Sequence, residues 1–235
     1  MKLITWNCNG AFRKKYHLLE QHDADLLIIQ ECEDPARSTQ AYQDWAGNHL
    51  WIGGNKNRGL GIFARKGIKL SPLPWPAEDL ELFLPCRIDD RFNLLAVWTK
   101  QANSPTFQYI GQFWKYLRQN KAEIAFEDIL ICGDFNSNVI WDKWDRWWNH
   151  SNVIEELEEL GIQSVYHKIT EERQGQESKP TFYLHRNLEK PYHIDYVFSS
   201  EVLLNQEKGA LELGSPEEWL GASDHLPMIY ISKIK

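Results

Sequence analysis

Short apolar segments that end in polar residues recur along this chain of 235 residues. Residues 2–8, 24–29 and 129–132 are almost wholly apolar, and residues 92–99 alternate at first and then become apolar up to Trp98. Short runs without alternation are typical of strands that are buried on both faces. The pattern therefore predicts sheets whose two faces are both covered.

Helical periodicity separates some of these strands. Residues 11–22 lie between the first two strands, and residues 108–119 precede the stretch 128–138. A strand–helix–strand order predicts a parallel pair with a right-handed crossover. The first two strands should then end at the same edge of a sheet, which brings Asn7 and Glu31 together.

The remaining segments are short and are connected in more than one way. Further strands are predicted at residues 49–52, 60–65, 80–87, 193–198 and 228–234, and helices at 34–46 and 152–160. Hairpins join some strands and helices join others, so we expect an α/β fold with two mixed β-sheets packed face to face and helices outside. No linker, repeat or low-complexity segment divides residues 1–235, which are predicted to form a single domain.

Polar side chains stand directly after three of the apolar strands. Asn7 ends the first strand, Glu31 follows the second, and the Gly-Asp-Phe-Asn segment 133–136 follows the strand at 129–132. Asp134 and Asn136 alternate around a phenylalanine and should project the same way. A carboxylate ligates a cation or accepts a proton, and an amide donates to an anionic oxygen. A simple turn would explain one such segment, but its recurrence favours a shared polar site.

Two later segments add a histidine and further carboxylates. Alternation in residues 193–198 places Asp195 on the polar face of a strand, and residues 222–227 bring Asp224 and His225 to the start of the last strand. A carboxylate can fix the tautomer of an imidazole. Asp195 and His225 are therefore predicted to act as a couple.

These motifs resemble the endonuclease/exonuclease/phosphatase superfamily, which includes apurinic endonucleases and pancreatic-type deoxyribonucleases. The resemblance rests on Asn7 in Thr-Trp-Asn-Cys-Asn-Gly, Gln30-Glu31, Gly133-Asp134-Phe135-Asn136, His193-Ile194-Asp195 and Ser223-Asp224-His225-Leu226-Pro227. The motifs stand in the family order and extend over essentially the whole chain. The resemblance implies a four-layer α/β sandwich with the active site at one edge of its two sheets.

The resemblance also implies a metal site. Glu31 resembles the principal ligand of Mg²⁺, for which Mn²⁺ is an alternative, with Asn7 beside it and Asp224 as a further carboxylate. Many nucleases of the family carry an acid two residues after the first-strand asparagine, where this chain has Asn9. A neutral ligand there should weaken metal binding, so we expect one tightly held Mg²⁺ rather than two.

Four residues resemble the hydrolytic centre of the family. Asp134 resembles the group that orients or deprotonates the attacking water, and Asn136 resembles a donor to the phosphoryl oxygens. Asp195 and His225 resemble the pair that holds an imidazole against the phosphate. Hydrolysis of a phosphate ester requires a hydroxide in line and groups that stabilise charge on the phosphoryl oxygens.

One departure from the family concerns the contact with the scissile phosphate. Trp98 stands where the family usually presents a histidine or a tyrosine, and an indole donates one hydrogen bond but is neither an acid nor a base. Trp98 either stacks on the substrate or ends the core between the sheets, and both interpretations stay open. Tyr109 or His185 is the alternative contact.

Basic and aromatic residues suggest how a nucleic acid would be held. Arg13, with Lys14 and Lys15, and the pair Lys56 and Arg58 are either phosphate contacts or ordinary solvated charges. A further group, Trp141, Trp144, Trp147 and Trp148, falls largely on one face of a predicted helix. It would form a platform for stacking bases or pack onto the domain, and helical spacing favours packing.

Composition narrows the class of partner. The net charge is −7, so affinity for nucleic acid must come from local patches. Cys8, Cys32 and Cys132 lie in or beside apolar strands, no CxxC pair is present, and no segment is apolar enough to span a membrane. We therefore expect reduced core thiols in a cytoplasmic protein with no evident obligate protein partner.

The patterns together predict a divalent-metal-dependent phosphoesterase, most simply a nuclease acting on a nucleic acid or nucleotide. The alternative is a phosphatase or phosphodiesterase for a small nucleotide or phosphorylated metabolite, which the acidic net charge favours. A catalytically silent binding module is disfavoured because the residues of the expected site are all present.

Overall fold

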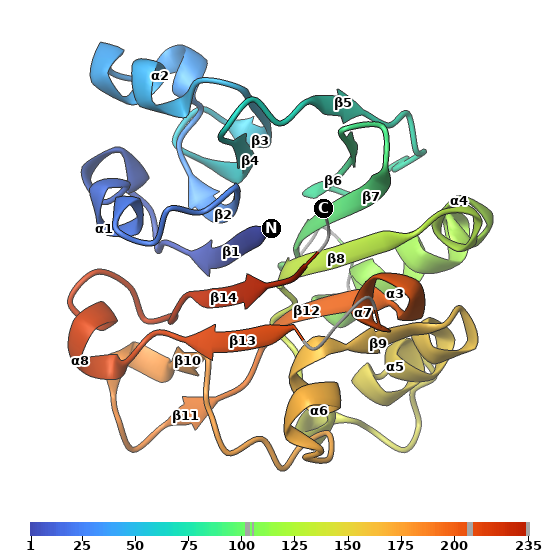
Figure 1. Cartoon of the computed structure of the whole chain (residues 1–235). Coiled ribbons are helices and arrows are strands. Elements are labelled where there is room, and N and C mark those ends of the chain that lie inside the picture. Colours follow the sequence, from blue (N-terminus) through green and yellow to red (C-terminus); the bar gives the residue numbers. More distant parts are fainter. Residues whose placement is uncertain (102–103, 105, 206–208, 234–235) are drawn as a thin grey trace.

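Two six-stranded mixed sheets lie face to face, with helices on their outer faces (Figure 1). The computed structural model of the chain describes residues 1–101, 104, 106–205 and 209–233. The arrangement is the four-layer α/β sandwich that the sequence predicts. No helix in this described part of the chain is both long and apolar enough to cross a bilayer.

The first sheet contains both ends of the described chain. Its strands, in spatial order, are β13 (Ala210–Leu213), β14 (Met228–Ile231), β1 (Lys2–Asn7), β2 (Leu26–Cys32), β4 (Arg58–Ala64) and β3 (His49–Asn55). β1 and β2 are parallel, as predicted, and the other neighbours are antiparallel. The carboxyl ends of β1 and β2 therefore share one edge of the sheet.

The second sheet has the same mixed character. Its strands, in spatial order, are β5 (Leu70–Pro72), β6 (Phe83–Ile88), β7 (Phe92–Trp98), β8 (Ile129–Asp134), β12 (Asp195–Ser200) and β9 (Ile162–Ser164). β7 and β8 form its parallel pair. The proline-containing β5 lies at the edge, where missing backbone donors cost no ladder hydrogen bond.

The helices and the small hairpin complete the layers. Helices of the α type are α1 (His17–Glu20), α2 (Gln40–Ala46), α3 (Ile110–Gln119), α4 (Lys121–Phe126), α5 (His150–Glu159), α6 (Val165–Thr170), α7 (Glu201–Asn205) and α8 (Pro216–Trp219). Short 3-10 helices are η1 (Phe12–Lys14), η2 (Pro35–Arg37), η3 (Val139–Trp141) and η4 (Leu184–Arg186), and the hairpin is β10 (Phe182–Tyr183) with β11 (Pro191–Tyr192). The single helix predicted at 11–22 is split, because the backbone leaves the helical region at Lys15.

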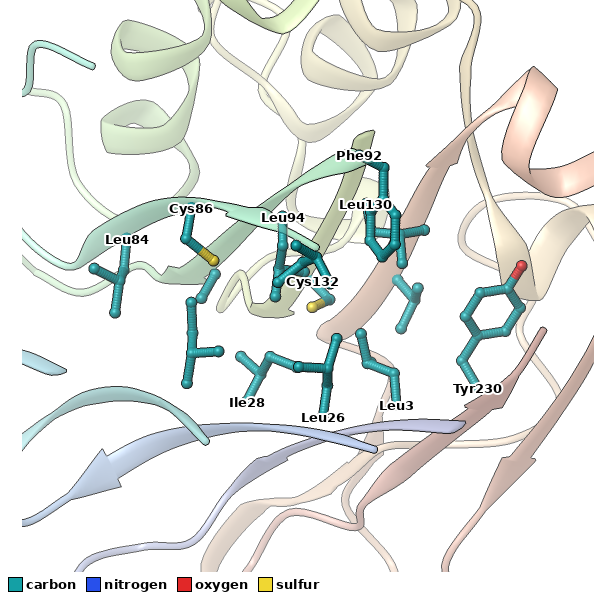
Figure 2. Packing of buried hydrophobic residues seen from close by; sticks show 14 of the residues in the cluster. Leu3, Leu26, Ile28, Leu84, Cys86, Phe92, Leu94, Leu130, Cys132 and Tyr230 are labelled. Atoms are coloured by element: carbon teal, nitrogen blue, oxygen red, sulfur yellow. The ribbon is translucent and has the colours of Figure 1, made fainter. Parts of the chain in front are cut away.

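Successive side chains of a strand point to opposite faces of its sheet, so the apolar side chains form three layers: one between the two sheets and one on the outer face of each sheet. Alternate residues such as Leu3, Leu26, Leu94 and Leu130 meet between the sheets (Figure 2). The intervening residues pack under the helices, against α3 and α5 on one side and against α1 and α2 on the other. Each central strand is therefore buried on both faces, which explains its continuous apolar sequence.

The four cysteines are buried and free of disulfides, as expected for core thiols. Cys132 faces the space between the sheets, whereas Cys8 and Cys32 lie in the cluster under α2. Burial raises the pKa of each of these three thiols well above its ordinary value, so they stay protonated and behave as small apolar side chains.

The tryptophan-rich segment after β8 is not the predicted helix. After η3 the chain runs irregularly until α5 begins at His150. The Asn149 side chain accepts from Lys143 N and Arg146 Nε and donates to the carbonyl oxygens of both residues. Such local side-chain bonds compete with helix formation. The helical spacing of the tryptophans was therefore a misleading signal.

Gly133 is required where β7 and β8 approach each other. Its φ is +146°, and a Cβ added there would lie 1.8 Å from Val97 O. We expect Gly133→Ala to lower the free energy of unfolding by about 3 kcal/mol or more, because the parallel ladder beside the site must shift. Urea denaturation measures the loss.

Gly54→Ala is the matched control for this substitution. Gly54 has no positive φ, and nothing lies within 4 Å of its added Cβ. The free energy of unfolding of Gly54→Ala should lie within about 0.5 kcal/mol of the wild-type value. Equal unfolding free energies for both variants would contradict the need for glycine at position 133.

Candidate active site at the polar end of the core

The candidate active site is the end of the inter-sheet core, where inward-facing positions become polar. Leu130, Cys132 and Asp134 follow one another on the same face of β8, and Leu3 and Asn7 share the inward face of β1. Burial continues to the end of both strands. The same alternation that builds the core therefore delivers Asn7 and Asp134 to its edge.

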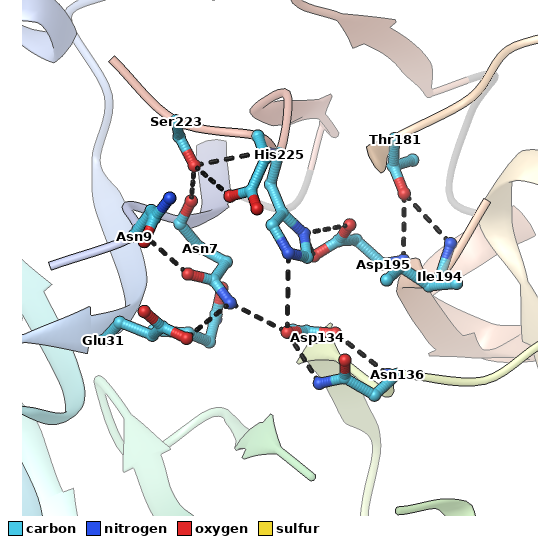
Figure 3. A network of polar contacts seen from close by, with 12 residues as sticks. Asn7, Asn9, Glu31, Asp134, Asn136, Thr181, Ile194, Asp195, Ser223 and His225 are labelled. Carbon is cyan, nitrogen blue, oxygen red and sulfur yellow. Dashed lines mark hydrogen bonds and ion pairs between the residues drawn. The ribbon is translucent and has the colours of Figure 1, made fainter. Parts of the chain in front are cut away.

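Asp134 is the centre of the hydrogen-bond network (Figure 3). Its carboxylate, which is fully buried, accepts from Asn7 Nδ2 at 2.8 Å and from Asn136 N and Nδ2 at 2.9 Å each. Asn136 Nδ2 also donates to Thr99 O at 2.8 Å. Both N–H groups of the Asn136 amide are thus occupied, so Asn136 holds Asp134 in place in this structure.

Asp195 and His225 form the predicted couple. Asp195 lies directly across the β8–β12 pair from Asp134. Its Oδ2 accepts from His225 Nδ1 at 2.9 Å, and His225 Nε2 lies 3.9 Å from Asp134 Oδ2. The latter separation is too long for a hydrogen bond. The second ring nitrogen therefore faces the buried carboxylate without a hydrogen bond between them.

The surroundings shift the protonation of both groups. Burial raises the pKa of Asp134, and the nearby positive charge of His225 opposes that increase. Burial alone would lower the pKa of His225, but Asp195 and Asp134 outweigh it and raise the pKa to about 9. The imidazole is therefore cationic at neutral pH, between two acids.

Glu31 reaches the same site through a distortion of its strand. The pairing register with β4 shifts between Gln30 and Cys32, and Glu31 has a φ of +65°. Such a bulge re-aims a side chain at the end of a strand. Glu31 Oε1 lies 3.5 Å from Asn7 Nδ2, and its Oε2 accepts from Arg58 Nε at 2.9 Å.

The donor set of this region fits a hard divalent cation. Glu31 and the half-buried Asp224 offer carboxylate oxygen atoms, which Mg²⁺ and Mn²⁺ prefer. The Asn7 amide turns its Nδ2 toward Glu31, and its Oδ1 accepts from Asn9 N. Among the described residues, the cations paired with the carboxylates of this site are His225 and Arg58. Negative charge is therefore in excess, and a divalent cation would balance it.

A tighter cluster consists of Asp134, Asp195 and His225, whose ligand atoms lie within 4.8 Å of one another. All three side chains are buried. His225 Nδ1 is already bonded to Asp195 and is therefore not a free metal ligand in this structure.

The expected substrate contacts fall into different environments. Trp98 is 8% exposed and belongs to the inter-sheet cluster, which favours the core interpretation over stacking on substrate. The half-exposed Arg13 guanidinium forms an ion pair with the buried Glu33. Tyr109 lines a groove together with Asn136, and His185 is exposed on η4.

Several residues that support the site were not identified from the sequence. Thr181 Oγ1 accepts from the backbone N of Asp195 at 3.0 Å and fixes the start of β12. Ser223 Oγ donates to Asn7 O at 2.7 Å and accepts from His225 N. Ser223 lies within a quoted motif, whereas Thr181 follows a polar loop without a distinctive pattern. Only the folded chain brings Thr181 to Asp195.

Comparisons with known proteins agree with this architecture. A family model described as "Endonuclease/Exonuclease/phosphatase family" matches residues 4–225. No curated protein sequence matches the chain. Similar solved structures include the 3′ phosphatase NExo from Neisseria bound to product DNA hairpin, with a TM-score of 0.70, 17% identity and 99% of both chains covered. An AP endonuclease from Archaeoglobus fulgidus gives a TM-score of 0.69 and 19% identity, with 100% of both chains covered.

The raised pKa of His225 predicts how stability depends on pH. A histidine whose pKa rises from 6.5 to about 9 on folding stabilises the fold fully below pH 6.5. That stabilisation is lost as the pH rises through 9. His225→Gln should therefore destabilise the metal-free protein more at about pH 6 than at about pH 9.5, by roughly 3 kcal/mol.

Urea denaturation in a chelator at the two pH values measures this difference. The comparison of variant with wild type cancels the titration of groups elsewhere in the chain. An equal destabilisation at both values would mean that Asp195 and Asp134 do not hold His225 as a cation.

Proposed function

The chain belongs to the endonuclease/exonuclease/phosphatase family, and we propose on this premise that it is a divalent-metal-dependent phosphoesterase that cleaves nucleic acid. The observation that carries the proposal is the buried Asp134, held by Asn7 and Asn136 and faced by the Asp195–His225 couple. In this proposal Asp134 is the base and His225, 3.9 Å away, is the hydrogen-bond donor. Hydrolysis of a phosphate ester needs both.

Asp134 is proposed to orient and deprotonate the attacking water. Its two oxygens are fixed by donors from Asn7 and Asn136, so the remaining acceptor directions are predetermined. Burial strengthens its basicity by raising its pKa toward neutrality. A base with a raised pKa accepts a proton from water more readily than an exposed aspartate.

His225 is proposed to donate a hydrogen bond to a phosphoryl oxygen. Asp195 holds Nδ1 and thereby directs Nε2 into the space beside Asp134. The Nε2–H group of a cationic imidazole stabilises the negative charge that grows on the phosphoryl group. Phe182, whose ring centroid lies 4.6 Å from that of His225, helps to keep the imidazole in place.

Glu31, Asn7 and Asp224 are proposed to hold Mg²⁺, or Mn²⁺ in its place. A bound divalent cation would supply neutralisation of charge on the phosphate. Arg58 pairs with Glu31 in this structure and balances part of its charge. Asn9 does not add a carboxylate, so a single tightly held ion remains our expectation.

A small phosphorylated metabolite remains the second candidate substrate, since the net charge of −7 gives no general attraction for a polyanion. Turnover of duplex DNA, single-stranded DNA, RNA and small phosphate esters with Mg²⁺ or Mn²⁺ separates the candidates. Whichever substrate is preferred, the same residues would perform the hydrolysis.

Removal of the metal-binding charge should abolish activity. Glu31→Gln keeps the shape of the side chain but removes its charge, so we expect metal affinity and kcat/KM to fall by roughly 100-fold or more. Excess chelator should abolish the activity of the wild-type protein, and added Mg²⁺ should restore that activity. Isothermal titration with Mg²⁺ and rate assays measure both effects.

Glu158→Gln, an exposed position on α5, is the control for Glu31→Gln. It should leave metal affinity and rate unchanged. Full activity of the wild type in chelator would overturn the metal dependence.

Replacement of the proposed base should remove turnover without unfolding the protein. Asp134→Asn keeps the size of the side chain, and we expect kcat to fall by about 100- to 10,000-fold. Asp128→Asn is the control. Asp128 lies just before the start of β8, at the end of the strand opposite Asp134, and its variant should keep the wild-type kcat. Circular dichroism and urea midpoints report the fold. A loss of rate that merely follows a loss of folded protein would assign Asp134 a structural role.

A further inference from the structure

Three tryptophans are exposed on the segment that follows the active-site strand. We call residues 138–149 the tryptophan loop. Trp144 is 98% exposed, Trp147 64% and Trp141 42%. Grouped large apolar side chains in water are uncommon on a folded protein and usually mark a binding surface. The fourth tryptophan, Trp148, is buried and packs on Phe107 at a ring-centroid distance of 4.7 Å.

The tryptophan loop has a defined shape despite its exposure. Asn149 joins the backbone at Lys143 and Arg146, and the Asp142 carboxylate accepts from His150 N and Ser151 N at the start of α5. These bonds fix the backbone on which the exposed indoles stand. A preorganised surface loses less conformational entropy when it binds a partner.

The start of the tryptophan loop is attached to the segment that precedes β12. Asn138 Nδ2 donates to His193 O at 3.0 Å, two residues before Asp195. Trp141 lies against Tyr192 of β11, with 5.2 Å between the ring centroids. The backbone that carries the exposed indoles is therefore joined to the segment beside Asp195.

A groove of about 590 Å³ lies between Asn136 and this loop. Asn136 lines it on the side of the site, and Trp141, Lys143 and Arg146 line it on the side of the loop. A volume of this size accommodates a nucleotide-sized ligand. Asp145 also lines the groove, so its charge is mixed. The indoles that line it are Trp141 and Trp148, whereas Trp144 and Trp147 stand on the same loop outside its lining.

This combination matches the chemistry of an unpaired nucleic acid strand. Every base offers a π-face on which an indole can stack, whereas the faces of paired bases are covered by their neighbours in the duplex. Lys143 and Arg146 supply positive charge for the backbone phosphates. An overall acidic protein would thereby gain a local site for a polyanion.

We propose that the tryptophan loop binds the unpaired bases next to the scissile phosphate, which makes single-stranded nucleic acid the substrate. The inference rests on the proposed function for the position of the scissile phosphate at Asp134. Trp144 and Trp147 stack on bases, and the groove carries the strand from the loop to the active site.

The binding test uses a fluorescently labelled single-stranded oligonucleotide in a chelator, so that hydrolysis cannot interfere. Trp144→Ala and Trp147→Ala should each weaken its affinity by about 5- to 150-fold. The same sequence as DNA and as RNA shows whether the sugar matters, and a hairpin duplex should bind weakly to all variants. Fluorescence anisotropy gives the dissociation constants.

Phe126→Ala is the matched control. Phe126 is 83% exposed on α4, just before the start of β8 and therefore at the end opposite Asp134. Its variant should bind as the wild type does. Unchanged affinity in both tryptophan variants, or an equal loss in Phe126→Ala, would overturn the proposal.

Two further outcomes separate this inference from the proposed function. A wild type that binds the strand but hydrolyses neither oligonucleotides nor bis(p-nitrophenyl) phosphate would refute the proposed function and leave the loop as a binding site. If the wild type hydrolyses both substrates and the tryptophan variants bind the strand with unchanged affinity, the proposed role of the tryptophan loop is refuted and the proposed function stands. Self-association that is lost in Trp144→Ala, with unchanged strand affinity, would show an interface between copies and also overturn the inference.

Discussion

The structure depends on one constraint, which is the need to hold a carboxylate at the buried end of an apolar core. Asp134 receives three hydrogen bonds, from Asn7 and Asn136, and these offset part of the cost of removing its charge from water. Asn7 ends β1 of one sheet, and Asn136 follows β8 of the other. The network can therefore form only when both sheets are packed, and it couples the site to the folding of the whole sandwich.

Electrostatic balance explains the neighbours of this carboxylate. Asp195 would add a second buried charge beside Asp134, but it is bonded to His225, whose raised pKa keeps it cationic. Glu31 is balanced separately by Arg58 at the surface end of the site. Asp134, Asp195 and His225 are thus buried, while Glu31 and Asp224 are partly exposed to solvent.

The apolar loop beside the site follows a different physical rule from the core. Core aromatic residues such as Phe135 and Tyr196 are fully buried and pack edge to face. Trp144 and Trp147 remain in water on a backbone fixed by Asn149. They are the two most exposed indoles in the described part of the chain. The proposed binding of an unpaired strand would account for this exposure.

Local pattern alone determined the layers and much of the site. Strand periodicity and the parallel crossovers placed Asn7, Asp134 and Asp195 at one edge, because alternation along a buried strand continues to its end. The Asp195–His225 couple followed from the need of an imidazole for a partner. These inferences use only local chemistry and strand order.

The tertiary structure decided what depends on contacts distant in sequence or on backbone detail. The bulge that turns Glu31 into the site, the support of Asp195 by Thr181 and the capture of Arg13 by Glu33 have no local signature. Trp98 could be assigned to the core only once both sheets were in place. The tryptophan segment has helical spacing, yet side-chain bonds to its own backbone kept it irregular, because local hydrogen bonding competes with helix formation.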